Sequence, residues 1–154
     1  MNIVVLAGGL STERDVSLNT GTMVSKALRS KGHNVIMLDV FMGYHEEEED
    51  ITDIFNHTEE ASADVAQIPG EAPDIAQVKA MRKDQSACFF GPNVIKICQA
   101  ADIVFMALHG ENGENGKIQA AFDLFGIQYT GSRYLGSALA MDKGISKKMF
   151  EAAG

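Results

Sequence analysis

Residues 3–17 constrain the fold of this chain more than any other stretch. A continuous apolar run at residues 3–6 stops at Gly8 and Gly9, and a polar loop then leads into residues with helical spacing. An uninterrupted apolar run is typical of a parallel strand that is buried on both faces. Glycine permits backbone angles that a Cβ would forbid and lets a ligand approach the main chain. The stretch therefore predicts the strand, glycine turn and helix start of an α/β unit that binds a nucleotide or a substrate.

Three charged residues, Glu13, Arg14 and Asp15, follow the glycines where a phosphate-binding loop has small neutral residues. Unpaired N–H groups give a helix N-terminus a partial positive charge, which favours an anionic ligand. A carboxylate at this place instead suits an ammonium ligand better than a phosphate. The local pattern leaves a second interpretation open, in which the loop is a solvated turn and its acid caps the helix.

Length and composition fit one globular domain. The 154 residues are 45% hydrophobic and 22% charged, which is enough apolar material for a substantial core. No apolar run approaches the roughly 20 residues of a membrane span, and no basic segment precedes the first strand as in a signal peptide. We therefore expect a cytoplasmic protein. The two cysteines, Cys88 and Cys98, lack metal-ligand spacing and are expected to be buried free thiols.

The net charge of −8 comes from one segment. Eleven acids and no Lys or Arg lie between His45 and Asp74, whereas the rest of the chain has 13 basic and 10 acidic residues. The basic residues do not cluster with aromatics, so no nucleic-acid surface is predicted. This acidic excursion, residues 41–75, is predicted to be a solvated loop, with a partner-binding acidic patch as the alternative. We expect it to be peripheral, so that deleting residues 46–60 leaves the melting behaviour largely unchanged.

The rest of the chain alternates between strand and helix patterns. Apolar runs predict further strands at 35–38, 103–108 and 127–130, and a short extra strand at 89–90. Apolar spacing predicts helices at 16–31, 76–82, 93–99, 118–125, 135–139 and 145–153. In the helix predicted at 16–31, Met23 is assigned to the apolar stripe and Gly21 to close packing on the sheet. Gly32 is assigned as the end of this helix, and Gly126 as the end of the helix predicted at 118–125. This alternation predicts an α/β fold with a mainly parallel sheet and helices on both faces.

A second glycine-rich loop begins at His109-Gly110 and ends at Gly116, directly after the strand predicted at 103–108. Because the carboxyl ends of parallel strands meet at one edge of the sheet, the two loops should lie together and could form one pocket. Glu13 and His109 are the residues there with acid–base character. A carboxylate can hold an ammonium group, and a histidine can orient that group or bind a carboxylate. A capping or packing role for His109 is the alternative.

Several well-known site patterns are absent from the sequence. No Ser-His-Asp arrangement, Walker loop or zinc-ligand spacing is present. His33, His45 and His57 are predicted to be solvated. Lys143, close to a turn, could meet a phosphate, although a solvated helix surface also explains it.

Four motifs in order resemble one family, the D-alanine–D-alanine ligases of the ATP-grasp superfamily. Residues 7–17 resemble the family pattern GG-x-S-x-E-R-x-V-S, and residues 107–116 resemble its HG-x-x-GEDG loop. Residues 129–132 and 137–143 supply the other two motifs. The resemblance covers residues 1–39 and 101–154 and implies a Rossmann-like, pre-ATP-grasp α/β fold. Asn115 stands where the family usually has Asp, from which we expect a local effect on the loop.

The resemblance implies the ligation of two D-alanines driven by ATP, for peptidoglycan precursor synthesis. The carboxylate of the first D-alanine is phosphorylated, and the amine of the second attacks the acyl phosphate. Glu13 matches the acid that holds the ammonium group of the first D-alanine, and Ser17 is expected to act with it in catalysis. Val16 belongs to the same loop, and His109 and Gly110 are expected to line the same pocket.

Cofactor binding is expected mostly outside this chain. Lys143 matches a lysine near the nucleotide phosphates. The resemblance implies that ATP and Mg²⁺ bind mainly to domains that are absent here, so no bound cofactor and no metal ligand are expected in the chain itself.

The resemblance also divides the chain. Residues 1–130 are expected to form the N-terminal substrate-binding domain, and residues 131–154 a linker and the first helices leading toward the absent ATP-grasp domain. We expect the chain alone to be inactive, with D-alanine as its small-molecule partner and no nucleic-acid or membrane partner; a homodimer is left open. The alternatives are a fragment of a D-alanine–D-serine or D-alanine–D-lactate ligase, and a stand-alone non-catalytic module that binds a ligand or a partner.

Overall fold

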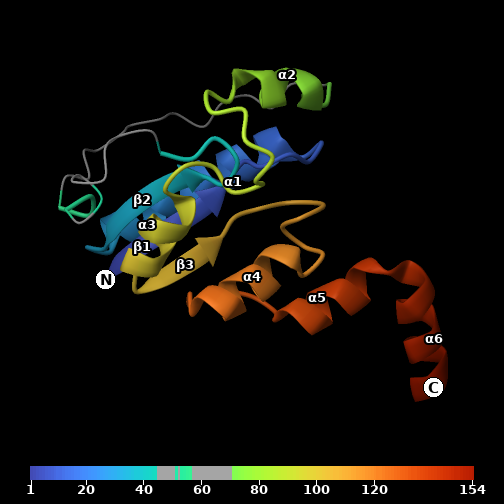
Figure 1. Cartoon of the computed structure of the whole chain (residues 1–154). Helices are drawn as coiled ribbons and strands as arrows, with labels where there is room; N and C mark the ends of the chain where they lie inside the picture. Colours follow the sequence, from blue (N-terminus) through green and yellow to red (C-terminus); the bar gives the residue numbers. More distant parts are fainter. Residues whose placement is uncertain (45–50, 52, 57–70) are drawn as a thin grey trace.

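A three-stranded parallel sheet lies at the centre of the computed structural model, which describes residues 1–44, 51, 53–56 and 71–154 (Figure 1). The strands are β1 (Asn2–Ala7), β2 (Asn34–Asp39) and β3 (Ile103–Met106), in the order β2-β1-β3. Val4 in the central strand pairs with Ile36 of β2 and Val104 of β3. The expected α/β fold with a parallel sheet is confirmed.

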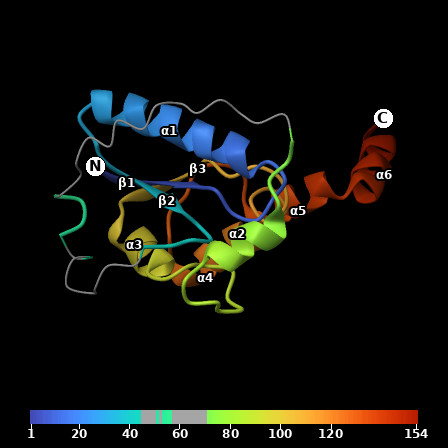
Figure 2. The same ribbon diagram turned by 90° about the horizontal axis from the view of Figure 1, so that it is seen from above.

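Helices lie on both faces of the sheet. The described part of the chain contains α1 (Arg14–Ser30), α2 (Ile75–Met81), α3 (Val94–Ala100), α4 (Lys117–Phe125), α5 (Tyr134–Met141) and α6 (Lys143–Ala153). Figure 2 shows α1 on one face and α3 and α4 on the other, while α5 and α6 extend away from the sheet. None of these helices is both long enough and apolar enough to cross a membrane.

The alternating side chains of β1 divide the core in two. Successive residues of a strand point to opposite faces of its sheet. Ile3 and Val5 pack with Leu18 and Leu28 of α1, whereas Val4 and its neighbours pack in the larger cluster on the other face. Both sets are buried, which is why β1 is a continuous apolar run and not an alternating one.

Helix α1 approaches the sheet through small residues. A Cβ at Gly21 would lie 2.9 Å from the Cβ of Ala7 and 3.0 Å from Cε of Met37, so the close packing expected there is confirmed. Ser17 and Ser25, one turn to either side of Gly21, are also buried. The assignment of Met23 to the buried stripe is wrong, because 53% of that residue is exposed.

Aromatic rings fill the core opposite α1. Phe122 of α4 is fully buried and stacks on Phe90, with 6.1 Å between ring centroids. The strand expected at 89–90 does not form; these two residues lie in a loop, and Phe89 packs on Phe41. The strand expected at 127–130 is reduced to an isolated bridge between Val104 and Tyr129.

The acidic excursion contributes to this core. Ile51, Ile54 and Phe55 are all buried and belong to the same cluster as Phe122. The expectation that residues 46–60 are peripheral is therefore wrong for these three side chains. The acidic run at 46–50 and the acids at 59, 60 and 64 lie outside the described residues.

Local geometry explains where the helices begin and end. Gly32 follows the C-cap residue Lys31 of α1, and Gly126 directly follows α4; their φ angles are positive, at 80° and 69°, so both expected helix ends are confirmed. Helix α3 begins one residue later than the helix predicted at 93–99. It begins at Val94, after Asn93 in the left-handed conformation, and the Asn93 side chain donates to the carbonyl of Tyr44 at 2.9 Å.

Helices α5 and α6 form an exposed arm. α5 contacts α4 and α6, but no residue of α5 or α6 is buried. The Asp142 side chain accepts the backbone N–H of Ile145 at 3.0 Å and so caps α6. Both helices predicted in this region form, while the domain boundary at residue 130 stays a prediction.

The two cysteines have different environments. Cys98 in α3 is buried, as expected, and burial raises the pKa of its thiol to about 12. Cys88 is exposed, so the expectation of a buried thiol is wrong there.

Alkylation should therefore distinguish the two thiols. The thiolate is the reactive form, and a raised pKa keeps Cys98 protonated at pH values where an ordinary cysteine, with a pKa of about 8.5, is ionised. Iodoacetamide at about pH 8.5 is expected to modify Cys88 and spare Cys98 until the chain is unfolded, as read by peptide mass spectrometry. A Cys88→Ser variant serves as the control, and rapid labelling of that folded variant would contradict the burial of Cys98.

Candidate functional site

Two loops meet at the carboxyl edge of the sheet, one after β1 and one after β3. The Ser17 hydroxyl joins them, because it accepts the N–H of Gly8 at 2.9 Å and donates to the carbonyl of Ala107 at 2.7 Å. Ser17 is completely buried. The convergence of the two loops expected from strand topology is thus observed, and Ser17 lies beneath it. Its expected catalytic role stays a prediction.

His109 is held from two sides by the first loop and α1. The Ser11 hydroxyl donates to the His109 carbonyl at 2.8 Å and accepts the Glu13 N–H at 3.1 Å. The Thr20 hydroxyl lies 3.1 Å from Nε2 of the His109 ring. Neither Ser11 nor Thr20 was assigned a role from the sequence, although Ser11 lies in the first motif and Thr20 lies three residues after Ser17, on the same side of the helix.

Glu13 extends from the start of α1 toward the second loop. It occupies the N-cap position, but its side chain makes no capping hydrogen bond, so the interpretation as a capping acid is wrong. Its carboxylate lies against Gly110, where an added Cβ would be 2.9 Å from Glu13 Oε2. Gly110 has a φ of 73°, which favours glycine here for a second reason. Val16, half-buried, lies in the first turn of the same helix.

Arg14 points inward and pairs with a residue that sequence reasoning missed. Its guanidinium donates to the Gly9 carbonyl at 2.8 Å and forms an ion pair with Asp39, the last residue of β2. Asp39 Oδ1 also accepts the N–H groups of Phe41 at 2.9 Å and Met42 at 3.0 Å. Arg14 and Asp39 therefore stabilise the glycine turn from below, whereas the Glu13 carboxylate faces the second loop.

Lys143 is not brought to these loops. It is the exposed first residue of α6, and Figure 1 places α6 at the far end of the molecule from β1. Among the described residues, no three His, Cys, Asp or Glu side chains are grouped as metal ligands. Asn115, the departure from the family pattern, accepts the N–H of Lys117 at 3.2 Å at the start of α4.

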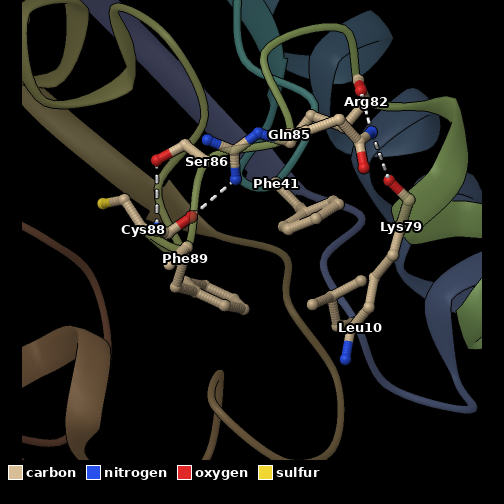
Figure 3. A pocket seen from close by; sticks show the side chains of 9 residues that line it. Leu10, Phe41, Lys79, Arg82, Gln85, Ser86, Cys88 and Phe89 are labelled. Atoms are coloured by element: carbon tan, nitrogen blue, oxygen red, sulfur yellow. Dashed lines mark hydrogen bonds between the residues drawn. The ribbon is translucent and has the colours of Figure 1, made fainter.

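A cavity of about 360 Å³ lies beside the first loop (Figure 3). Leu10, Phe41 and Phe89 supply its apolar wall, and Lys79 lies at its edge. Buried Arg82 anchors the surrounding loop, since its guanidinium lies 4.8 Å from the centre of the Phe41 ring and donates to backbone carbonyls.

Arg82 also pairs with Asp84. Hydrogen bonds from this guanidinium hold the pKa of Asp84 below its usual value. Sequence reasoning missed Arg82, because a single arginine in a polar stretch resembles any solvated one.

A second cavity, of about 440 Å³, lies between the second loop and α5 and is lined by Leu108, Glu114 and Ser137 among others. Neither Glu13 nor His109 lines this cavity or the one beside the first loop. Glu13 and His109 thus lie outside both cavities, whereas Leu10 of the first loop and Glu114 of the second loop each line one of them.

Known proteins resemble this chain over nearly its whole length. The family model described as D-ala D-ala ligase N-terminus matches residues 2–132. The motifs predicted a resemblance over residues 1–39 and 101–154, and the family model also matches the residues between these two segments. The D-alanine–D-alanine ligase of Pediococcus pentosaceus is 48% identical over 150 residues, covering 97% of this chain and 42% of that protein. The ligase of Lacticaseibacillus casei is 45% identical over 152 residues, covering 97% and 41%.

A solved structure agrees with this similarity. The D-alanine–D-alanine ligase of Bacillus anthracis, complexed with ATP, has a TM-score of 0.59 and 25% identity, covering all of this chain and 37% of that one. The chain therefore spans about two fifths of the length of the relatives that it matches. It belongs to the family of D-alanine–D-alanine ligase N-terminal domains.

Proposed function

We propose that this chain supplies the site for the first D-alanine of an ATP-dependent D-alanine–D-alanine ligase that serves peptidoglycan synthesis. The position of the Glu13 carboxylate against Gly110 carries the proposal. An ionised carboxylate forms strong, charge-assisted hydrogen bonds to an ammonium group. Hydrogen-bond contacts of the hydroxyl groups of Ser11, Ser17 and Thr20 hold the two loops together before a ligand binds. This lowers the entropy cost of ordering the loops on binding.

We assign the reaction itself to a protein with the length of the ligases that the chain matches. ATP with Mg²⁺ would activate the carboxylate of the first D-alanine by phosphorylation, and the amine of the second would then displace the phosphate. In this chain Glu13 and His109 bind and orient the first D-alanine, Val16 and Gly110 shape the loops, and Ser17 maintains their geometry in support of catalysis. Lys143 is proposed as the contact to the nucleotide phosphates, and the chain alone is expected to be inactive.

The names of the relatives favour D-alanine over the alternatives. The proteins from Pediococcus and Lacticaseibacillus are both D-alanine–D-alanine ligases, which supports this substrate over D-serine or D-lactate as the second one. We place the reaction in the cytoplasm because ATP is its proposed co-substrate. The homodimer stays a prediction, for which the sedimentation of the chain is the check.

Replacing Glu13 with Gln should weaken D-alanine binding at least about tenfold, because a hydrogen bond to a charged group contributes about 1.5–3 kcal/mol. The measurement is a titration of the ¹⁵N-labelled chain with D-alanine, followed at the amides of Glu13, His109 and Gly110. Glu111→Gln is the matched control. Glu111 is an exposed residue of the second loop, and its Oε1 lies 3.8 Å from Nζ of Lys117.

Two results would overturn the proposal. One is the absence of any D-alanine-induced shift at the two loops of the unmodified chain. The other is equal affinity for D-alanine in the unmodified chain and in Glu13→Gln. L-alanine, titrated in parallel, is expected to bind more weakly than D-alanine.

A further inference from the structure

The hydroxyl of Thr20 has two polar neighbours but only one hydrogen. It donates to the Val16 carbonyl, 2.9 Å away within α1, and a carbonyl oxygen can only accept. The second neighbour is Nε2 of His109 at 3.1 Å. If the hydrogen of Thr20 stays on the Val16 carbonyl, its oxygen accepts in this second contact and Nε2 donates.

We propose that Thr20 is a positioning residue that holds neutral His109 with its hydrogen on Nε2, leaving Nδ1 as a hydrogen-bond acceptor. A neutral imidazole carries one N–H, and the partner of that N–H decides which nitrogen has it. The main chain of His109 is fixed separately, by the Ser11 hydroxyl on its carbonyl, so Thr20 acts on the ring.

This tautomer assigns a role to His109 within the proposed function, on which the inference rests. A histidine beside an amino acid can serve either the ammonium group or the carboxylate. With Nε2–H engaged by Thr20, the neutral ring has no second N–H for a carboxylate. Glu13 and Nδ1 of His109 are then both acceptors on the paired loops, and this combination suits the ammonium group of the ligand.

Nitrogen NMR of the unliganded chain tests the tautomer directly. Ring spectra recorded at about pH 8.5, well above the ordinary histidine pKa of about 6.5, report which nitrogen of His109 is protonated, and a His109→Gln variant assigns the signals. We expect Nε2–H alone. Because free neutral histidine already favours Nε2–H, the decisive comparison is with Thr20→Val, in which the signals should shift toward a mixture of the two tautomers.

Two further variants control for structural side effects. Thr20→Ser keeps the hydroxyl and should restore the spectrum of the unmodified chain. Thr22→Val removes a hydroxyl that bonds back to the Leu18 carbonyl at 3.0 Å in the same helix, and it should leave His109 unchanged. An Nδ1–H tautomer in the unmodified chain, or no change in Thr20→Val, would overturn the proposal, and the first of these needs no variant to fold.

Two small molecules, each with one of the two charged groups of alanine, test this inference independently of the proposed function. Ethylamine carries the ammonium group without the carboxylate, and propionate carries the carboxylate without the ammonium group. Ethylamine should move the Nδ1 signal of His109 at millimolar concentration while propionate leaves it in place, and the reverse would overturn the inference. Failure of D-alanine to bind while His109 remains Nε2–H would instead contradict only the proposed function.

Discussion

Replacing Phe122 with alanine is expected to lower the free energy of unfolding by about 3–5 kcal/mol. Phe122 is fully buried in α4, stacks on Phe90 with ring centroids 6.1 Å apart, and lies 6.0 Å from the ring of Tyr129. Alanine would remove the ring from all of these contacts and leave a cavity that the surrounding side chains fill only in part. Because a whole domain is stable by only about 5–15 kcal/mol, much of the folded population would be lost on mild heating.

Urea unfolding followed by circular dichroism measures this change, with a lower midpoint and an unaltered slope. Phe125→Ala is the matched control, since it is the same change in the same helix at a residue that is 48% exposed. We expect the control to lose less than about 1 kcal/mol. If Phe122→Ala and Phe125→Ala lowered the free energy of unfolding equally, α4 would not pack through the face that carries Phe122.

The strand and turn patterns were predictable because each reflects one local cause. A strand buried on both faces must be apolar at every position, and β1 between β2 and β3 is such a strand. Gly32 and Gly126 end helices because a positive φ is needed there. Gly21 was informative for a similar reason, since an interior helix glycine is unfavourable unless close packing requires it.

Packing between distant segments was not predictable in the same way. Met23 was assigned to the buried stripe because it is apolar, whereas α1 faces the sheet with Ser17, Gly21 and Ser25. Close approach of a helix selects small side chains, and a count of apolar residues overlooks them. Phe89 and Phe90 resemble a strand in sequence, yet their rings pack on Phe41 and Phe122 from a loop.

The prediction that residues 46–60 are peripheral is wrong for three side chains, because average composition conceals single residues. Ile51, Ile54 and Phe55 are spaced as one helical turn within a strongly acidic stretch. All three are buried in the main cluster, which the average composition of the stretch does not reveal.

Some residues of the candidate site were predictable from the sequence and others were not. The meeting of Glu13 with the loop at His109 follows from strand topology alone, and the structure confirms that the loops converge. Thr20 and Asp39 belong to none of the motifs, and Ser11 lies in the first motif without a role assigned to it, because a single hydroxyl or acid gains its role only from the group placed beside it. Lys143 matched a motif but lies on the exposed arm.

Arg14→Met is expected to lower the free energy of unfolding by about 3–5 kcal/mol, because breaking a buried ion pair leaves the other charge without compensation. The side chains of Arg14 and Asp39 are only 11% and 15% exposed. The substitution would also remove the donor to the Gly9 carbonyl. Thermal and urea unfolding measure the loss. Lys117→Met is the control, since it removes an ion pair between exposed side chains and should change stability by less than about 1 kcal/mol.

A double-mutant cycle with Asp39→Asn separates the charge of Asp39 from its other contacts. Asparagine keeps a side-chain oxygen for the N–H groups of Phe41 and Met42, but it leaves Arg14 without a counter-charge. Arg14→Met and Asp39→Asn should therefore each be costly alone and clearly less than additive together, because the second change removes a charge that the first has isolated. Strict additivity would mean that the two side chains are not coupled in solution. Since Glu13 directly precedes Arg14, the coupled case also predicts faster hydrogen exchange at Gly9 and Glu13 in either single variant, which links the ion pair to the geometry of the ligand-binding turn.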